Sequence, residues 1–293
     1  MIIVHIFKGL GNQLTQYATG RALALRRGTE LRLDVSSYES APSRRFGLGH
    51  FNVQAAVATA ADVARVRRTG NSFVARAYRA VDLLKPYYKR RFVRDPLWRF
   101  DPNMFKVSRN AYLYGYWGHE RYFSDYRSVL LDECDVKEEF VTPARDLIDE
   151  VSDASSVSVH IRRGDYVTDE YAASLFGALP LNYYQRAMAR MVASVPDACF
   201  YVFSDDIAWA RDALGGRYPT VYVDRFSTDE DYLDLKVMSC CKHNIIANST
   251  FSWWGAWLNR NPAKIVMAPY EWYRPEKIDN DDVVITPPSW IRL

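Results

Sequence analysis

Residues 157–166 read Val-Ser-Val-His-Ile-Arg-Arg-Gly-Asp-Tyr, a short apolar strand pattern that runs directly into two adjacent arginines. Open α/β sheets bind ligands beyond the carboxyl ends of their strands. A guanidinium group stays protonated at any working pH and can bond two phosphate oxygens at once. We therefore expect Arg162 and Arg163 to form an anion site that suits a diphosphate. An isolated sequence of this kind would be a solvated surface turn, but the motifs around it favour the site.

Strand and helix patterns alternate regularly after residue 156. The predicted strands are 157–161, 199–204, 220–223, 244–247 and 264–268, and the predicted helices are 182–195, 207–214, 229–241 and 251–259. This alternation is typical of a parallel, doubly wound sheet.

The amino-terminal part shows the same pattern on a smaller scale. It predicts a strand over 2–7, a glycine turn, a helix over 14–27 closed by Gly28, and a strand over 31–34. The region 36–150 is predicted to be mainly helical and irregular, with an aromatic stretch at 112–120 that forms a strand leading into a loop. The predicted fold class is therefore α/β, with two Rossmann-like domains, 1–150 and 151–293, facing each other across a cleft.

The bulk properties are those of a globular protein with two domains. The chain has 293 residues, of which 48% are hydrophobic, and a formal net charge of +3. Its apolar stretches are shorter than the roughly 20 residues that span a bilayer, and its amino terminus lacks the order of a signal peptide. We therefore expect a cytoplasmic location. The four cysteines lack metal-ligand spacing, which predicts buried thiols and neither zinc nor disulfides.

The segment 65–99 concentrates positive charge. It carries eleven arginines and lysines, opposed only by Asp82 and Asp95, with apolar residues between them. Two interpretations stay open: a solvated helical face, or a surface for an acidic ligand or for peripheral contact with the anionic inner membrane. A nucleic-acid partner is not expected, because the segment lacks any nucleic-acid-binding domain signature.

Three further motifs fall at predicted turns between strands and helices. Asp205 and Asp206 follow a strand and could bind a metal, although a helix cap is the favoured interpretation for Asp206. Residues 248–257 read Asn-Ser-Thr-Phe-Ser-Trp-Trp-Gly-Ala-Trp, which predicts a phosphate seat or a plain N-cap at a helix start, followed by tryptophans that pack in the core. Residues 9–13, Gly-Leu-Gly-Asn-Gln, predict a close-approach turn with Asn12 pointing into a cleft.

Taken together, residues 8–18, 160–166, 203–206 and 248–254 resemble, in order and spacing, the α-1,2-fucosyltransferases of glycosyltransferase family 11, bacterial type. One departure is Thr15, where many members carry Phe. The resemblance implies a GT-B fold, GDP-fucose as the donor, inversion at the anomeric carbon, and no cofactor or required metal.

The resemblance also implies roles for individual residues. Arg162 matches the arginine that holds the β-phosphate, and Asp234 matches a carboxylate that accepts from guanine. The implied donor-binding residues are Asn12, His160, Arg162, Arg163, Asp234, Ser249, Thr250 and Phe251. The catalytic residues are Arg162, which stabilises the leaving phosphate, and Asp165 as a candidate base, with His119 as another.

The leading functional hypothesis is transfer of L-fucose to the 2-hydroxyl of a terminal galactose in a surface polysaccharide of the O-antigen type, on an oligosaccharide that could be lipid-linked. One alternative is a fucosyltransferase of another linkage or a transferase of another GDP-sugar. A non-enzymatic alternative is a lectin-like sugar-binding protein that uses the 14% aromatic content.

Overall fold

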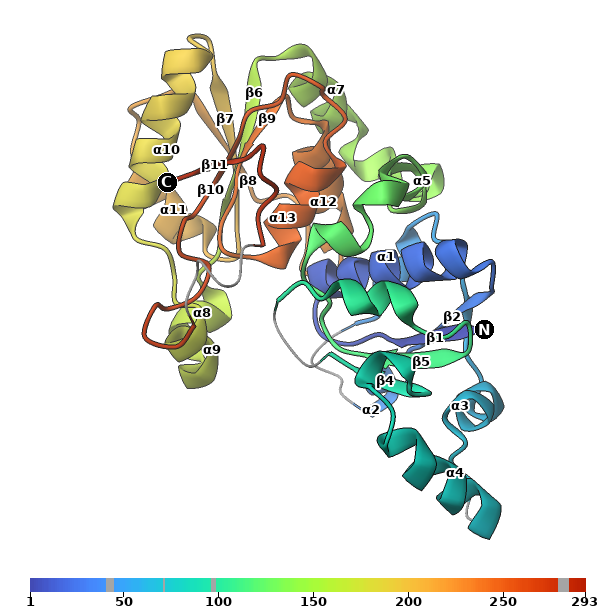
Figure 1. Ribbon diagram of the computed structural model, residues 1–293. Coiled ribbons are helices and arrows are strands. Elements are labelled where there is room, and N and C mark those ends of the chain that lie inside the picture. The colour runs from blue at the N-terminus through green and yellow to red at the C-terminus, as the bar shows by residue number, and fades with distance from the viewer. Residues whose placement is uncertain (41–44, 71, 96–98, 279–284) are drawn as a thin grey trace. The chain divides into compact units, whose positions relative to one another are not determined.

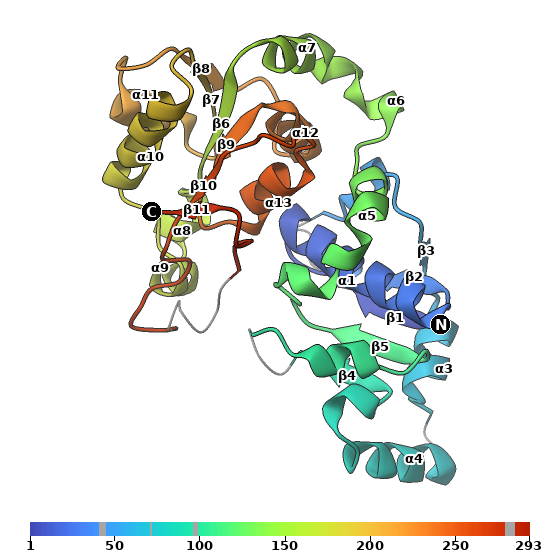
Figure 2. The same ribbon diagram turned by 45° about the horizontal axis from the view of Figure 1, so that its top comes forward.

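The computed structural model describes residues 1–40, 45–70, 72–95, 99–278 and 285–293. The chain divides into two compact units, Met1–Cys134 and Asp135–Leu293, and each is built around its own parallel β-sheet (Figures 1 and 2). The predicted α/β class with two parallel sheets is therefore confirmed. Sequence patterning put the boundary near residue 150, whereas the compact units divide after Cys134, because the helix at 145–153 packs within the second unit.

The first unit contains a five-stranded sheet in the order β3-β2-β1-β5-β4. Its strands are β1 (Ile2–His5), β2 (Leu31–Asp34), β3 (Ala56–Val57), β4 (Phe92–Arg94) and β5 (Ala111–Tyr114). Its helices are α1 (Leu10–Arg27), α2 (Ser37–Ser40), α3 (Ala60–Arg67), α4 (Phe73–Leu83) and α5 (Arg127–Glu133). Helix α1 packs on β1 on one face of the sheet, and α3 packs on β5 on the other (Figure 1).

Helix α1 shows where local sequence signals were accurate and where they were not. Gly28 adopts the left-handed conformation, with φ of 56°, and closes the helix as predicted. The helix begins at Leu10 instead of residue 14, because the N–H groups of Asn12 and Gln13 already donate to the carbonyl of Gly9. The glycines that predicted a longer turn therefore lie at the N-cap and in the first helical turn.

Two strands of the first unit were missed by the sequence analysis. Strands β3 and β4 are two and three residues long and lie at the edges of the sheet. A stretch this short carries little alternation of apolar and polar residues, so the region was interpreted as helical and irregular. The aromatic stretch at 112–120 does begin with β5 and continue into a loop, as predicted.

The second unit contains a six-stranded sheet in the order β11-β10-β9-β6-β7-β8. Its strands are β6 (Ser156–Ile161), β7 (Cys199–Ser204), β8 (Thr220–Val223), β9 (His243–Ile245), β10 (Val266–Ala268) and β11 (Ile291–Arg292). Its helices are α6 (Glu138–Val141), α7 (Arg145–Asp153), α8 (Gly164–Thr168), α9 (Glu170–Leu175), α10 (Leu181–Ser194), α11 (Ile207–Leu214), α12 (Asp231–Cys240) and α13 (Thr250–Leu258).

Strand β6 lies at the point where the strand order reverses. It pairs with β7 on one side and β9 on the other, and all six of its residues are buried. Helices α10 and α11 cover one face of the sheet, while α7, α12 and α13 cover the other (Figure 1). A doubly wound sheet binds ligands at this reversal, so the carboxyl end of β6 is the expected site.

The core of the second unit is rich in aromatic side chains. Trp253, Trp254 and Trp257 of α13 are buried and contact one another, which confirms that they pack in the core. All four cysteines are free; Cys134 and Cys241 are buried, whereas Cys199 and Cys240 are only partly so. Among the described residues, no helix has the length and apolar character that a bilayer crossing needs.

Contact between α1 and β1 depends on a glycine. A Cβ on Gly20 would lie 2.2 Å from Cγ2 of Val4, a fully buried residue of β1. We predict that Gly20→Ala lowers the free energy of unfolding by about 1–3 kcal/mol, because overpacking forces the helix away from the sheet. Urea denaturation measures this change. The control is Gly118→Ala, where a Cβ meets no atom within 4 Å; equal effects of the two variants would contradict the account.

Candidate active site

The guanidinium of Arg162 lies between two carboxylates just beyond β6. Its Nη2 donates to Asp165 at 2.6 Å, and its Nη1 pairs with Asp205 at 2.9 Å. The side chain is about three-quarters buried. Two ion pairs fix the plane of this guanidinium, and the remaining N–H groups of its fork are available to a ligand.

Asp205 connects the ends of β6 and β7. One carboxylate oxygen pairs with Arg162, and the other accepts from the backbone N–H of Arg163 at 2.8 Å. The carboxylate lies where a side chain on Gly164 would be, since a Cβ there would come within 2.5 Å of Oδ2 of Asp205. The glycine of the motif therefore allows the loop after β6 to approach the loop after β7.

Asp206 both caps a helix and holds the second arginine. Its side chain accepts from the N–H of Trp209, which confirms the predicted cap of α11. It also pairs with Nε of Arg163 at 3.1 Å, and that guanidinium lies 4.0 Å above the ring of Trp209. Both aspartates therefore bind arginines, and among the described residues no three His, Cys, Asp or Glu side chains are grouped to hold a metal ion.

A second set of hydrogen bonds and ring contacts connects the loop after β6 to the loop after β9. The hydroxyl of Tyr166 donates to the carbonyl of Asn248 at 3.0 Å, and its ring stacks on Phe176 at 5.1 Å. The Asn248 amide donates in turn to the carbonyl of Gly177 at 3.1 Å. Residue 177 has a φ of 66°, which favours glycine. Tyr166 and Asn248 lie inside the sequence motifs, but no role was expected for them or for Phe176 and Gly177.

The start of α13 brings together several predicted donor-binding residues. Ser249 is the N-cap, and its hydroxyl accepts from the N–H of Phe251. Thr250 is the first residue of the helix, and the ring of Phe251 lies 5.5 Å from the imidazole of His160 on β6. A phosphate site and an N-cap can both exist here. The Ser249 cap uses only the N–H of Phe251, and the other N–H groups of the first turn can bind a phosphate.

Two buried polar atoms at this edge lack a hydrogen-bond partner among the described residues. They are Nδ1 of His160 and Oδ1 of Asn248, on side chains that are 5% and 1% exposed. Burial, with a smaller effect of Arg162, lowers the pKa of His160 to about 3, so the imidazole is neutral at working pH. Unpaired buried polar atoms are costly, and a bound ligand is one way to satisfy them.

The charges at the carboxyl edge nearly cancel. Arg162 and Arg163 contribute two positive charges, and the three aspartates that contact them contribute three negative ones. The net charge of this group of side chains is therefore not positive, so it does not by itself attract an anion. Oriented donors can: the fixed guanidinium forks and the N-terminus of α13 present N–H groups toward one edge.

Asp234 lies in the first turn of α12, which follows β8 and therefore begins at the same carboxyl edge. Its carboxylate has no hydrogen-bond partner among the described residues, and burial is the main reason that its pKa rises to about 7, with the charges of Asp231 and Glu230 adding to the effect. A desolvated, unpaired carboxylate is a strong acceptor for a ligand that carries N–H donors.

Two other predicted residues belong to the first unit. Asn12 lies in the first turn of α1, and its side chain is partly exposed. The Nδ1 atom of His119 accepts from the N–H of Arg121, and burial lowers the pKa of His119 to about 4. His119 thus caps a short 3₁₀ turn, and the arrangement described above is formed by the second unit alone.

Comparison with known proteins agrees with this architecture. The model of glycosyl transferase family 11 matches residues 73–293. The O-antigen biosynthesis glycosyltransferase WbnK of Escherichia coli is 31% identical over 97% of this chain and 98% of its own length. The α-1,2-colitosyltransferase of E. coli is 30% identical over 100% of this chain and 99% of its own length. This chain belongs to glycosyl transferase family 11.

Solved structures with the same fold are more distant in sequence. Fucosyltransferase NodZ from Bradyrhizobium has a TM-score of 0.53 and 16% identity, covering 87% of this chain and 92% of its own. POFUT1 in complex with GDP-fucose has a TM-score of 0.51 and 13% identity, covering 91% of this chain and 97% of its own. At this level of identity the likeness shows the fold.

The raised pKa of Asp234 makes stability depend on pH. The folded state holds this proton more tightly than the unfolded chain, whose pKa is near 3.8, so stability falls as pH rises from about 4 through about 7. We predict that Asp234→Asn raises the free energy of unfolding at pH 8 by about 2 kcal/mol, and by much less at pH 4.5. Urea denaturation at both pH values measures this.

The control for this experiment is Asp224→Asn, which removes an exposed carboxylate of the same unit that pairs with Arg211. We expect no comparable stabilisation at pH 8. A pH-independent difference between Asp234→Asn and the parent protein would show that the carboxylate of Asp234 is not desolvated.

Proposed function

We propose that this protein is an inverting glycosyltransferase that moves L-fucose from GDP-fucose to the 2-hydroxyl of a terminal galactose in a surface polysaccharide of the O-antigen type. The observation that carries the proposal is Arg162, fixed by two carboxylates at the strand reversal of a family 11 chain. Membership of a glycosyltransferase family favours an enzyme over a lectin. WbnK, a relative along the whole chain, supports the polysaccharide context.

In this mechanism the bond between C1 of fucose and the β-phosphate oxygen breaks, and GDP leaves with the bonding electrons. The acceptor hydroxyl attacks C1 from the opposite face and releases its proton to solvent. Negative charge therefore grows on the β-phosphate as the sugar becomes cationic. Donors held in place before the reaction stabilise this charge without reorganising, which is the role we propose for Arg162 and for the N–H groups at the start of α13.

Asp165 and Asp205 act in this proposal as positioning residues. They hold the guanidinium of Arg162 at 2.6 and 2.9 Å, so the fork is oriented before the donor binds. Asp165 was expected to be a base, but its contact with Arg162 supports the positioning role better. An oxocarbenium-like reaction that transfers the proton late needs little help from a base.

The guanine base would bind at Asp234. Its carboxylate can accept from both N1–H and N2–H₂ of guanine, and adenine offers no such pair of donors. Because only the ionised carboxylate accepts both bonds, affinity for GDP should rise as pH passes through about 7. We assign the remaining donor contacts to His160, Arg163 and the loop 249–251, and we assign the first unit to the acceptor side of the reaction. The donor contact expected of Asn12 stays a prediction.

Colitosyl transfer is the second candidate, since an α-1,2-colitosyltransferase matches the whole chain at 30% identity. Colitose lacks the 3-hydroxyl of fucose, so the two donors differ by one polar group. The test is incubation with GDP-fucose or GDP-colitose and a panel of galactosides, followed by NMR analysis of the product.

We expect transfer from GDP-fucose, an α linkage to O2 of galactose, and hence inversion of the β-linked donor. Transfer from GDP-colitose alone would replace the first candidate by the second. A linkage to another hydroxyl, or retention of configuration, would contradict the proposed reaction.

Substitution of Arg162 tests the phosphate site. We predict that Arg162→Ala lowers kcat/KM by at least about a hundredfold, because a contact that strengthens in the transition state is lost. Arg162→Lys should recover only part of the activity, since one ammonium group cannot reproduce a planar fork. The matched control is Arg211→Ala, which removes a half-exposed, ion-paired arginine from α11. Steady-state kinetics that show equal losses in Arg162→Ala and Arg211→Ala would refute the assignment.

We also propose that the reaction needs no divalent metal. The carboxylates that a metal would use, Asp205 and Asp206, are engaged by the two arginines of the motif. Turnover should therefore stay within about twofold of its normal value in excess EDTA. Loss of activity that Mg²⁺ or Mn²⁺ restores would assign these aspartates to a metal instead.

A further inference from the structure

Helix α4 turns its apolar side outward. Phe73 and Leu84 are 85% and 86% exposed, the two most exposed large apolar side chains in the described part of the chain. At 100° per residue, one face of the helix and its C-cap carries Phe73, Val74, Ala77, Tyr78, Val81 and Leu84. We call these residues the apolar face of α4. No residue of the helix is buried, so this face is not packed in the core of the first unit.

The polar side of α4 is the side that holds the helix in place. Arg79 donates to the carbonyls of Arg68 and Gly70, at 2.7 and 2.9 Å. Asp82 accepts from the backbone N–H of Arg91 at 2.6 Å. A helix of a globular protein ordinarily packs its apolar stripe inward. Here the polar contacts fix the helix and leave the apolar face open, and α4 projects beyond α3 and β4 in both views (Figures 1 and 2).

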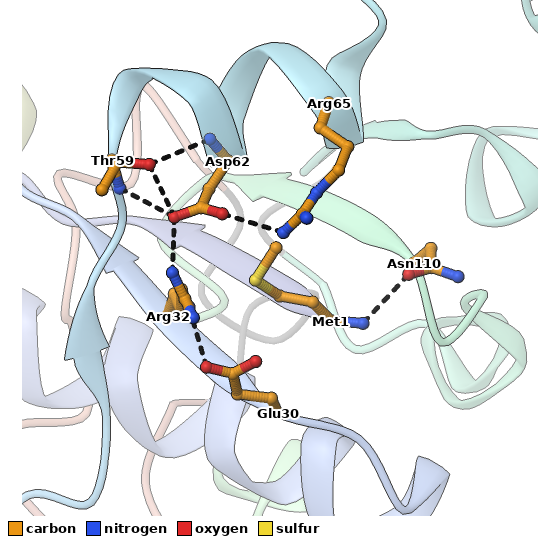
Figure 3. A network of polar contacts seen from close by, with 7 residues as sticks. All are labelled: Met1, Glu30, Arg32, Thr59, Asp62, Arg65 and Asn110. Carbon is orange, nitrogen blue, oxygen red and sulfur yellow. Dashed lines mark hydrogen bonds and ion pairs between the residues drawn. The ribbon is translucent and has the colours of Figure 1, made fainter.

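Helix α3, which precedes α4 in the chain, is held to the sheet by polar contacts. Figure 3 shows Asp62 of α3 in a capping box with Thr59, where it also accepts from Arg32 of β2 and from Arg65. The guanidinium of Arg68, at the end of α3, lies 4.1 Å above the ring of Tyr78. Ion pairs therefore hold α3 to the sheet, and Arg68 at the end of α3 contacts Tyr78 of α4.

The surroundings of α4 are strongly basic. Residues 65–99 hold eleven arginines and lysines and two aspartates. Several of these cations are not neutralised by their contacts: Arg79 and Arg90 donate to backbone carbonyls, and Arg67 lies over the ring of Phe92. Arg65, Arg68 and Arg91 line a hollow beside α3. The exposed apolar face of α4 thus belongs to a segment with a large excess of positive charge.

We propose that α4 docks this protein on an anionic lipid bilayer. The apolar face enters the boundary between headgroups and acyl chains, and the flanking arginines and lysines meet the lipid phosphates. This inference is independent of the sugar and acceptor that the enzyme uses. Of the two interpretations of the basic segment, the proposal adopts the membrane surface, and the vesicle experiment below tests it.

Charge complementarity favours a membrane over a second copy of this chain. Two copies that met at α4 would bring two basic segments together, and like charges at an interface are repulsive. Protein interfaces are also depleted in charged residues at their centres. An anionic bilayer, in contrast, offers an apolar layer beneath a negative surface, which matches both parts of the α4 region.

The test is co-sedimentation of the full chain with vesicles. We expect binding to phosphatidylcholine vesicles that contain phosphatidylglycerol, and little binding to phosphatidylcholine alone. Raising the ionic strength from about 0.1 M to about 1 M shortens the screening length from about 10 Å to about 3 Å, so binding should weaken. Equal binding to the two kinds of vesicle, or binding to neither, would overturn the proposal.

Variants localise the binding to α4. We expect Phe73→Ser/Leu84→Ser to lower the partition coefficient on anionic vesicles by at least about tenfold, because the most exposed apolar side chains are lost. A second double variant on α4, Val74→Ser/Val81→Ser, should also weaken binding. Its matched control is Val57→Ser/Val129→Ser, which changes two exposed valines away from α4 and should not weaken binding. Thermal melting confirms that each variant is folded.

Self-association is measured on the same samples by light scattering. If the parent protein is a dimer that Phe73→Ser/Leu84→Ser dissociates, and vesicles do not bind it, then the apolar face of α4 is an interface between copies and the membrane proposal is wrong. If the control valine variant loses vesicle binding as fully as the α4 variants do, the binding does not depend on α4, and the proposal is also overturned.

Discussion

The carboxylate of Asp205 is the contact on which the site depends. It joins the ends of two neighbouring strands, since one oxygen pairs with Arg162 and the other accepts from the backbone of Arg163. Gly164 makes room for it, because any side chain there would meet the carboxylate. With Asp165 on the other side of Arg162, the guanidinium is oriented before any ligand binds. The strict parallel order of β6 and β7 places these groups at one edge.

The site works through orientation more than through net charge. Three carboxylates contact two arginines, so the edge has no excess of positive charge to attract a diphosphate from a distance. Fixed N–H groups, a helix start, and unpaired buried atoms on His160 and Asn248 provide directed contacts instead. This arrangement suits a transition state in which negative charge develops on a phosphate. Oriented dipoles interact more strongly with that charge than with the less charged ground state, so they lower the barrier.

Sequence patterns predicted the second unit better than the first. Its central strands β6 and β7 are six residues long and mostly buried, and the limits of β7, β8 and α11 match the expectation. In the first unit the short edge strands β3 and β4 were missed, because two or three residues show no clear period. Motifs singled out Arg162 and Ser249 as candidates, and the family resemblance singled out Asp234. The contact between Asp205 and Arg162 joins residues that are distant in the sequence. Only the register of β6 against β7 reveals it.

The most direct test of the central claim is a crystal structure of the complex with GDP. The account predicts that oxygens of the β-phosphate lie within hydrogen-bond distance of the Arg162 guanidinium, beside the start of α13, and that guanine N1 and N2 face the carboxylate of Asp234. A diphosphate bound away from β6, with the Arg162 guanidinium still enclosed by its two aspartates and touching no ligand atom, would contradict it.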